Sequence, residues 1–265
     1  MRNLMSMLAA TPLPRPTSAL RLPFSPRARA QIGLFLFAYL VYSAARFVTI
    51  GDLPDAQSHA HWIVNLEQST GTAVEASVQG AFDGTWVMWV LNRLYLIAQL
   101  GVIPAVLIFL YKRNAAIYAT LRNTILATWL ISVPVYGLFP VAPPRLADIG
   151  ITDTITTTTS FAMDSNLSTS FYNELAAVPS LHVGFAVAVG FALFAVLRNP
   201  ALKFLALLWG PVIGLAVVAT GNHFVFDMVA GVVASAAGYG LGAVAARIRI
   251  KRPSTAGLGP AFAEA

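Results

Sequence analysis

Residues 201–231 read ALKFLALLWGPVIGLAVVATGNHFVFDMVAG, and this stretch decides the fold. One apolar run ends at the polar residues TGNH, and a second apolar run starts directly after them. A helix needs about 20 mostly apolar residues to cross the hydrocarbon of a bilayer. The first run, 201–220, has this length, and the second extends over 225–246. The stretch therefore predicts two consecutive membrane-spanning helices joined by a short polar turn.

Four further apolar runs precede this pair, at 30–50, 86–111, 123–139 and 182–197. The chain of 265 residues is 57% hydrophobic and 11% charged, less than half the charged share usual in a soluble domain. We therefore expect an all-α polytopic membrane protein, a bundle of six transmembrane helices, with five or seven spans as the alternatives.

The ends of the chain differ from this bundle in composition. Residues 1–29 are basic and proline-rich, and residues 249–265 lack periodicity, so we expect two disordered tails around a catalytic membrane domain at 30–248. A cleaved signal peptide is the competing interpretation of the first run. The length of the run and of the tail before it favours a retained helix.

The net charge of the chain is +6, and the positions of its basic residues indicate how the membrane helices are oriented. Basic residues precede the first run, follow the last, and occupy every second connection between them. By the positive-inside rule both termini are cytoplasmic, and segments 51–85, 140–181 and 220–224 face outward, as in a multi-pass plasma-membrane protein. The positive charge thus gives no reason to expect a nucleic-acid partner. Segment 51–85 has no Lys or Arg but five acids: Asp52, Asp55, Glu67, Glu75 and Asp83.

Two outer segments have a pattern of their own. Residues 55–80 space Trp62, Leu66, Val74 and Val78 at roughly helical intervals, which is typical of a broken amphipathic helix at the membrane interface. In the long segment 140–181, the threonine-rich run TDTITTTTS at 152–160 is most simply a mobile stretch. Connections of this length are often functional.

Three smaller motifs receive structural interpretations. His59 and His61 are two apart and would point to different sides of a helix, so a metal clip is the weaker interpretation. The GPVIG motif at 210–214 has the spacing of close helix packing. The chain has no cysteine, which excludes disulfides and thiolate metal sites.

The residues that could perform chemistry gather at the outer ends of the apolar runs. Ser180 and His182 follow a proline at the start of one run, where the free amides and dipole of a helix attract an anion. His223 and Asp227 are four apart at the start of the last run and would share a helix face. Asp227 could then hold one imidazole nitrogen of His223 and leave the other free as a nucleophile or base.

Two arginines could bind an anion at this site. Arg145 is the single Lys or Arg of segment 140–181, and its guanidinium offers a fork for phosphate oxygens; a surface charge near lipid headgroups is the alternative. Arg93 lies about two turns inside the second run. It could reach the site, or its side chain could extend outward to the interface.

Three motifs in chain order now carry a resemblance: PVAPPR at 140–145, AAVPSLHVG at 176–184 and TGNHFVFDMVAG at 220–231. Together they resemble the signature of the type 2 phosphatidic acid phosphatase superfamily, and most of all its branch of bacterial homologues of fungal inositol phosphorylceramide synthase. The resemblance runs from about residue 55 to 235. It implies a six-helix membrane enzyme that needs no metal or other cofactor and passes a phosphoryl group through a phosphohistidine.

The resemblance assigns roles by position. His223 would be the nucleophile, Asp227 its orienting partner and His182 the general acid. Ser180 and Arg145 would bind the phosphate, with Arg93 as a further candidate. The implied partners are a lipid phosphate or phospholipid substrate and the bilayer itself.

The chain departs from the superfamily's phosphatases at five positions, where it has Leu138, Leu146, Leu181, Ala216 and Val217. Leu138 and Val217 replace a Lys and an Arg, so two phosphate-binding cations are missing. A phosphomonoester is nearly a dianion at neutral pH and a phosphodiester is a monoanion, so fewer cations suit a diester. We therefore expect headgroup phosphoryl transfer of the inositol-phosphate type. Hydrolysis of phosphatidic acid or a prenyl phosphate by the same site is the alternative.

Two other classes of function remain as alternatives. A metalloenzyme would use His182, His223 and Asp227 as ligands. A transporter or scaffold would keep the fold without catalysis, although the chain shows no internal repeat of the kind that transporters use.

Overall fold

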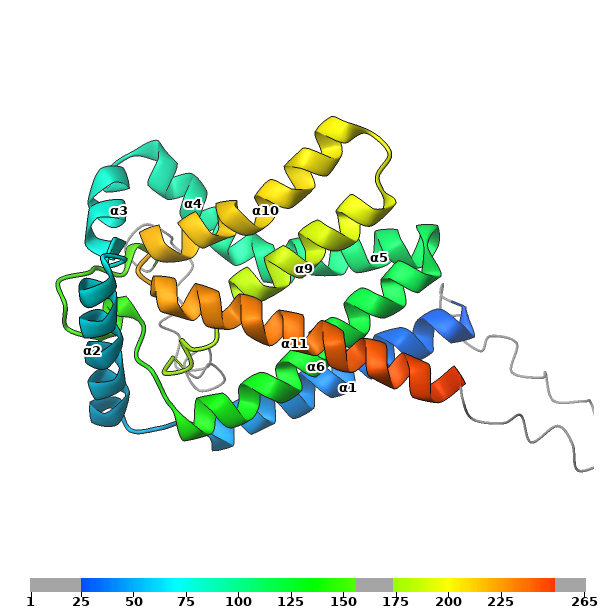
Figure 1. Cartoon of the computed structure of the whole chain (residues 1–265), viewed down its shortest axis with the longest axis horizontal. Coiled ribbons are helices and arrows are strands. Elements are labelled where there is room, and N and C mark those ends of the chain that lie inside the picture. Colours follow the sequence, from blue (N-terminus) through cyan, green and yellow to red (C-terminus); the bar gives the residue numbers. More distant parts are fainter. Residues whose placement is uncertain (1–24, 156–173, 251–265) are drawn as a thin grey trace, which may run out of the picture. The chain divides into compact units, whose positions relative to one another are not determined.

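The computed structural model describes residues 25–155 and 174–250 (Figure 1). The chain divides into two compact units, residues 1–39 and 40–265. Helix α1, Pro26–Val48, begins before the predicted domain boundary at residue 30. The remainder of the predicted N-terminal tail, and nearly all of the C-terminal tail, lies outside the described residues.

Helices make up nearly all of the regular structure in the described ranges, so the all-α fold class is confirmed. A single isolated bridge pairs Val141 with Ala176 in parallel. After α1 the helices are α2 (Leu53–Thr70), α3 (Glu75–Phe82), α4 (Trp86–Ile97), the π-helix η1 (Ala98–Val102), α5 (Ile103–Arg113), α6 (Ala115–Leu138), the 3-10 helix η2 (Pro144–Leu146), α9 (Leu181–Val196), α10 (Pro200–Ala219) and α11 (Val225–Ile250).

Each of the six predicted membrane spans is helical, but not all are long and apolar enough to cross a bilayer. Four stretches in the described part of the chain meet both conditions: Pro26–Val48, Trp86–Arg113, Pro200–Ala219 and Val225–Val244. Helix α9 has 16 residues, about 24 Å at 1.5 Å per residue, which is less than the thickness of the hydrocarbon. Helix α6 is long, but its hydroxyl, Asn and Arg side chains lower its mean hydropathy. The chain is thus a multi-pass membrane protein, and the count of six spans stays a prediction.

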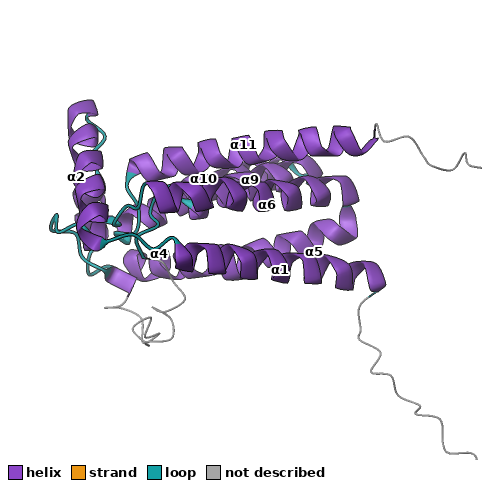
Figure 2. Cartoon of the chain, turned by 90° about the horizontal axis from the view of Figure 1, so that it is seen from below, coloured by secondary structure: helices purple, strands orange, loops and turns teal. Residues whose placement is uncertain are grey.

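Helix α9 is the central element of the second unit. It packs against α10, α11 and α6, and α10 also contacts α4 and α3 (Figures 1 and 2). Small residues allow this close packing, because a Cβ on Gly190 would meet the backbone of Ala206 in α10. The predicted packing role of GPVIG is confirmed: Gly210 lies against Val187 of α9, and Gly214 against Met228 of α11.

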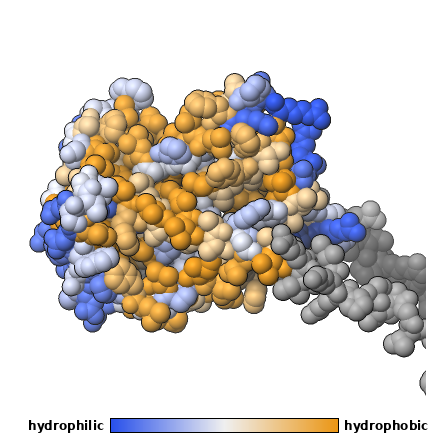
Figure 3. Space-filling model, in the orientation of Figure 1, coloured by the Kyte–Doolittle hydropathy of each residue, from blue (hydrophilic) through white to orange (hydrophobic). Residues whose placement is uncertain are grey.

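The outward faces of these helices are apolar. Figure 3 shows hydrophobic surface over the middle of the helices and hydrophilic surface toward their ends. Leu130 and Leu138 of α6 are 74% and 84% exposed, and Phe204 of α10 is 62% exposed. An apolar surface of this extent is unfavourable in water and favourable against lipid tails.

Helices α2 and α3 cover one end of the second unit (Figure 1), and α2 lies across the direction of the long helices (Figure 2). The predicted broken helix at 55–80 is thus two helices, because Gly71 ends α2 in a left-handed conformation with φ 71°. The face of α2 that packs inward is not the predicted apolar stripe. Trp62 is 52% exposed, whereas the buried residues are Ala56, Ala60, Ile63 and Glu67.

The first part of the threonine-rich run is hydrogen-bonded to two helices, and the mobility of the run stays a prediction. The side chain of Gln79 donates to the Thr152 carbonyl at 2.9 Å and accepts from the Thr152 N–H at 2.9 Å. The Thr154 hydroxyl donates to Asn92 Oδ1 at 2.9 Å. These bonds tie the segment to α3 and α4. Residues 156–160 lie outside the described residues.

Substitution of a glycine on α11 tests whether α11 approaches α9 closely. A Cβ on Gly231 would overlap the backbone of Ser180, whereas a Cβ on Gly240 of the same helix would meet nothing within 4 Å. We expect Gly231→Ala to lower the free energy of unfolding by roughly 1–3 kcal/mol, the usual cost of overpacking. Gly240→Ala should leave it unchanged or slightly raised. Thermal unfolding of both variants in detergent checks this, and equal melting temperatures would contradict it.

Candidate active site

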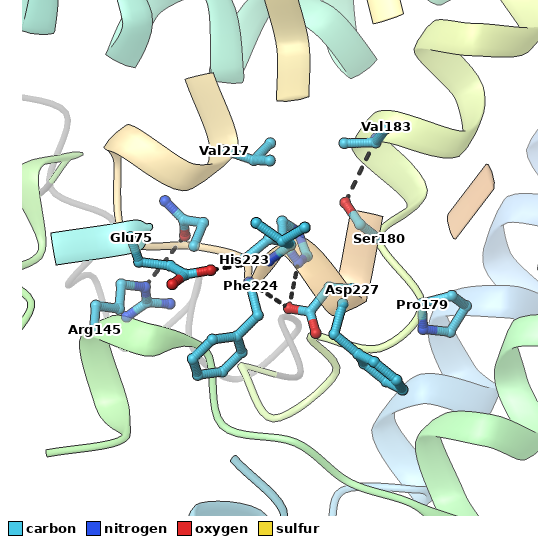
Figure 4. Close-up of polar contacts among 12 residues, drawn as sticks. Glu75, Arg145, Pro179, Ser180, Val183, Val217, His223, Phe224 and Asp227 are labelled. Atoms are coloured by element: carbon cyan, nitrogen blue, oxygen red, sulfur yellow. Dashed lines mark hydrogen bonds and ion pairs between the residues drawn. The ribbon is translucent and has the colours of Figure 1, made fainter. Parts of the chain in front are cut away.

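The first turns of α9 and α11 meet at the end of the unit that α2 and α3 cover. The Ser180 N–H donates to the backbone carbonyl of Asp227 at 3.0 Å, which joins the two helix starts directly. Ser180 is fully buried and is the N-cap of α9, with its hydroxyl accepting from the Val183 N–H at 3.5 Å (Figure 4). The expected helix start near Pro179 is confirmed. A phosphate contact of Ser180 stays a prediction.

His223 and Asp227 form the predicted pair. His223 Nδ1 lies 3.2 Å from Asp227 Oδ2, and the same oxygen accepts from the Phe224 N–H at 2.9 Å (Figure 4). The contact does not arise from helical spacing, because α11 begins only at Val225. Asp227 instead reaches back from the first turn to the loop before it. With Nδ1 directed to a carboxylate, Nε2 of His223 is the nitrogen left for chemistry.

His182 lies in the first turn of α9, beside this pair. Its ring centroid is 6.0 Å from that of His223, so the structure brings the two histidines together. Tyr95 of α4 stacks on His182 with centroids 4.1 Å apart and an interplanar angle of 19°. Sequence reasoning missed Tyr95, since an aromatic residue within an apolar run gives no signal that separates it from other core residues.

Arg145 is held next to His223 by its backbone and its side chain. Its N–H donates to the Gly221 carbonyl at 3.0 Å, and its Nε donates to Asn222 Oδ1 at 3.2 Å. The sequence predicted that Arg145 faces the histidines, and the bond to Asn222 places it beside them. Two of its partners were not predicted: its guanidinium forms ion pairs of 3.3 Å with Asp153 and with Glu174.

Arg93 has a different environment. Its guanidinium carbon lies 4.9 Å from the ring centroid of Trp89, one turn earlier on α4 and 54% exposed. This cation–π contact favours the interpretation that Arg93 extends to the interface. A phosphate contact of Arg93 stays a prediction.

Two cavities meet at Arg145 and Glu174. The inner cavity, about 20 Å³, has room for about one water and is lined by Tyr95, Asn222 and His223 among others. The outer one measures about 600 Å³ and is lined by Leu53, Gln57, Arg145, Leu146, Asp148, Glu174 and Leu175. A phosphoryl group is larger than one water, so its entry beside His223 requires the side chains around Arg145 to move.

Two acids of segment 51–85 also reach the site, although the sequence suggested only outward-facing charge. Glu67 and Glu75 are 2% and 5% exposed. Glu67 Oε1 accepts from the Phe226 N–H at 2.7 Å, and Glu75 Oε1 accepts from the Val225 N–H at 3.0 Å. The Phe224 N–H binds Asp227, so three consecutive amides at the start of α11 each donate to a different carboxyl group.

Neither metal interpretation gains support from the described residues. His59 Nδ1 lies 2.7 Å from the Pro140 carbonyl oxygen and its ring packs on Phe139, whereas His61 is exposed, so the two rings do not converge. Within residues 25–155 and 174–250, no three His, Asp or Glu side chains are grouped as metal ligands.

Comparison with protein families matches residues 61–241 to the PAP2 superfamily, the type 2 phosphatidic acid phosphatase group. The match covers more than half of the chain and includes Arg145, Ser180, His182, His223 and Asp227. No curated protein and no solved structure matches the chain. The predicted superfamily is confirmed, and the inositol phosphorylceramide synthase branch stays a prediction.

Proposed function

We infer that this chain, which belongs to the PAP2 superfamily, is a membrane phosphotransferase that moves the headgroup phosphoryl of a phospholipid through a phosphohistidine. Membership implies a phosphatase or phosphotransferase that acts on phosphoesters. The observation that carries the finer proposal is the charge around Arg145. One guanidinium faces two carboxylates, those of Asp153 and Glu174.

This charge balance suits a monoanion better than a dianion. A phosphomonoester brings close to two negative charges at neutral pH, and a phosphodiester brings one. The positions where superfamily phosphatases have further cations are apolar here, with Leu138 84% exposed and Val217 fully buried. A dianion would therefore approach one cation that is flanked by two carboxylates, and an approaching diester is repelled less. The favoured substrate is a phospholipid diester of the inositol-phosphate type.

The size of the inner cavity adds a requirement for binding. Because that cavity holds about one water, the substrate phosphate has to take the place of a present partner of Arg145. Glu174 lines both cavities and its side chain is 39% exposed, so its carboxylate is the partner with more freedom to leave. The phosphate then occupies the guanidinium fork beside His223.

The proposed reaction has two steps with balanced proton movements. In the first, His223 Nε2 attacks phosphorus, the bond to the leaving oxygen breaks, and His182 donates a proton to that oxygen. In the second, an acceptor hydroxyl attacks phosphorus, its proton passes to His182, and the phosphorus–nitrogen bond breaks. Asp227 stabilises the positive charge on His223 in both steps. Water as the acceptor gives hydrolysis, which is the alternative function as a lipid phosphate phosphatase.

The site lies where a lipid headgroup would lie if the apolar helix faces are in the bilayer. It is at the end of the helices that α2 and α3 cover, beyond the apolar middle of the surface (Figures 2 and 3). With the positive-inside rule, this end is the outer face of the plasma membrane and both termini are cytoplasmic. The lipid would then enter sideways, with its tails among the lipid tails.

Substitution of the two histidines tests the chemistry. We expect His223→Ala to abolish turnover and any acid-labile phosphoenzyme, because the nucleophile is lost. His182→Ala should slow a substrate with a poor leaving group by about 10² to 10⁴ and an activated aryl phosphoester far less. Activity is measured on phosphatidylinositol, phosphatidic acid and a prenyl phosphate, with and without a lipid alcohol. Full activity of purified His223→Ala would rule out the phosphohistidine, and no turnover of any substrate would favour a transporter or scaffold.

Removal of the two carboxylates beside Arg145 tests the preference for a diester. We expect the double variant Asp153→Asn, Glu174→Gln to raise kcat/KM for a monoester relative to a diester by about tenfold or more, since two repulsive charges disappear. Asp55→Asn, an exposed acid on α2, is the matched control and should leave the ratio unchanged. The ratio is measured with matched lipid monoester and diester substrates. A ratio that does not change in the double variant would contradict the charge argument.

A chelator separates this mechanism from a metalloenzyme. Every proposed proton and phosphoryl transfer uses a side chain, so activity should persist after dialysis against EDTA. Loss of activity with EDTA and its recovery on addition of a divalent metal would favour the metalloenzyme with His182, His223 and Asp227 as ligands.

A further inference from the structure

We propose that Glu67 and Glu75 are positioning residues for the phosphoryl-transfer site: they share one proton and hold the first turn of α11, and with it His223 and Asp227, in the reactive position. The proposal rests on the proposed function for its chemistry. Its geometry is independent of any substrate.

The two carboxyl groups reach α11 from separate helices. Glu67 is the last inward-facing residue of α2, and Glu75 is the first residue of α3. Their bonds to the Phe226 and Val225 amides, at 2.7 and 3.0 Å, satisfy groups that have no partner within a helix. These amides lie directly between His223 and Asp227 in the chain. A shift of either carboxyl group would therefore move the catalytic pair.

Three carboxyl groups at one helix start make a strong negative cluster. The amides and dipole of α11 attract negative charge, but only about half an elementary charge is available there. Asp227 is already in the first turn, so full ionisation of Glu67 and Glu75 would place three charges close together inside the protein. Protonation of one carboxyl group relieves this repulsion.

Glu67 is the group that holds the proton. The pKa of Glu67 is raised from 4.5 to about 8, mainly by burial and further by the nearby charges of Glu75 and Asp227, against the lowering effect of the Phe226 amide. These are also the acids that face it from α3 and α11. Its Oε2 is buried and accepts no hydrogen bond from the described residues, and an interaction with the Glu75 side chain also raises its pKa, as expected if a proton lies between the two carboxyl groups. At neutral pH the pair thus bridges α2 and α3 while it binds α11.

The raised pKa predicts how stability depends on pH. Between the ordinary value of 4.5 and about 8, the folded protein keeps a proton on Glu67 that the unfolded chain releases. The folded state binds more protons in this window, so stability falls as the pH rises through it. Above about 8, Glu67 ionises in the folded protein too, and repulsion from Glu75 loosens the start of α11.

The experiment compares Glu67→Gln and Glu67→Ala with the Asp55→Asn control, in the full-length protein in detergent. Gln retains an acceptor for the Phe226 amide and an N–H donor for Glu75, so it imitates the protonated acid. We expect the kcat of the wild type to fall near pH 8, where Glu67 ionises. Glu67→Gln should keep near wild-type kcat at pH 7, lose this fall, and show a weaker decrease of melting temperature between pH 5 and 8. Glu67→Ala should lose roughly ten- to hundredfold in kcat with little change in KM, since the catalytic pair is misplaced. Asp55→Asn should behave as the wild type.

Three results would overturn the proposal. One is a wild-type pH profile in Glu67→Gln, which would place the titration elsewhere. Another is an inactive but folded Glu67→Gln at pH 7, which would mean that the ionised acid is needed. The third is a wild-type kcat in Glu67→Ala. The comparison of melting temperature with pH needs no substrate, so it can fail or succeed independently of the His223→Ala test of the proposed function.

Discussion

The site depends on the contacts of one residue, Asp227. Its backbone carbonyl accepts the Ser180 N–H, which joins α11 to the start of α9. Its side chain binds both the Phe224 amide and His223 Nδ1. Asp227 is fully buried, and burial of a carboxylate is costly unless it is hydrogen-bonded. The same bonds therefore stabilise the buried carboxylate and hold His223 and the Phe224 amide in place. The position of His223 and the packing of α9 against α11 thus depend on the same residue.

Close backbone contact between helices makes this arrangement compatible with the rest of the fold. Gly231 of α11 lies against the Ser180 backbone, and Gly184 of α9 lies against the carbonyl of Gly231. Larger residues would hold the two helix starts apart and separate His182 from His223. The short helix α9 has these contacts on several sides, which is why so much of it is buried. Helix packing in this protein is therefore also the means by which the two histidines meet.

The polar groups around the two histidines form two sets with different partners. Arg145 forms ion pairs with Asp153 and Glu174 beside the histidines, and in the proposed function the substrate phosphate binds to this arginine. Glu67 and Glu75 instead bind backbone amides at the start of α11. In the proposed function, the first set determines which class of phosphoester is favoured. In the further proposal, the second set holds His223 in position and makes that position depend on pH.

The sequence by itself determined the membrane class, the helices and four candidate site residues that the structure brings together: His182, His223, Asp227 and Arg145. The length of apolar runs, the distribution of charge between them and the spacing of motif residues can all be read from short stretches of the chain. Only the tertiary structure decided that Arg145 is paired with two acids, that Tyr95 stacks on His182, and that Glu67 and Glu75 are buried against α11. These contacts join residues far apart in the chain, and an acid in a polar segment looks the same whether it meets water or a helix start. The physical reason is that burial and charge pairing arise only when the helices pack together, so a local sequence pattern does not predict them.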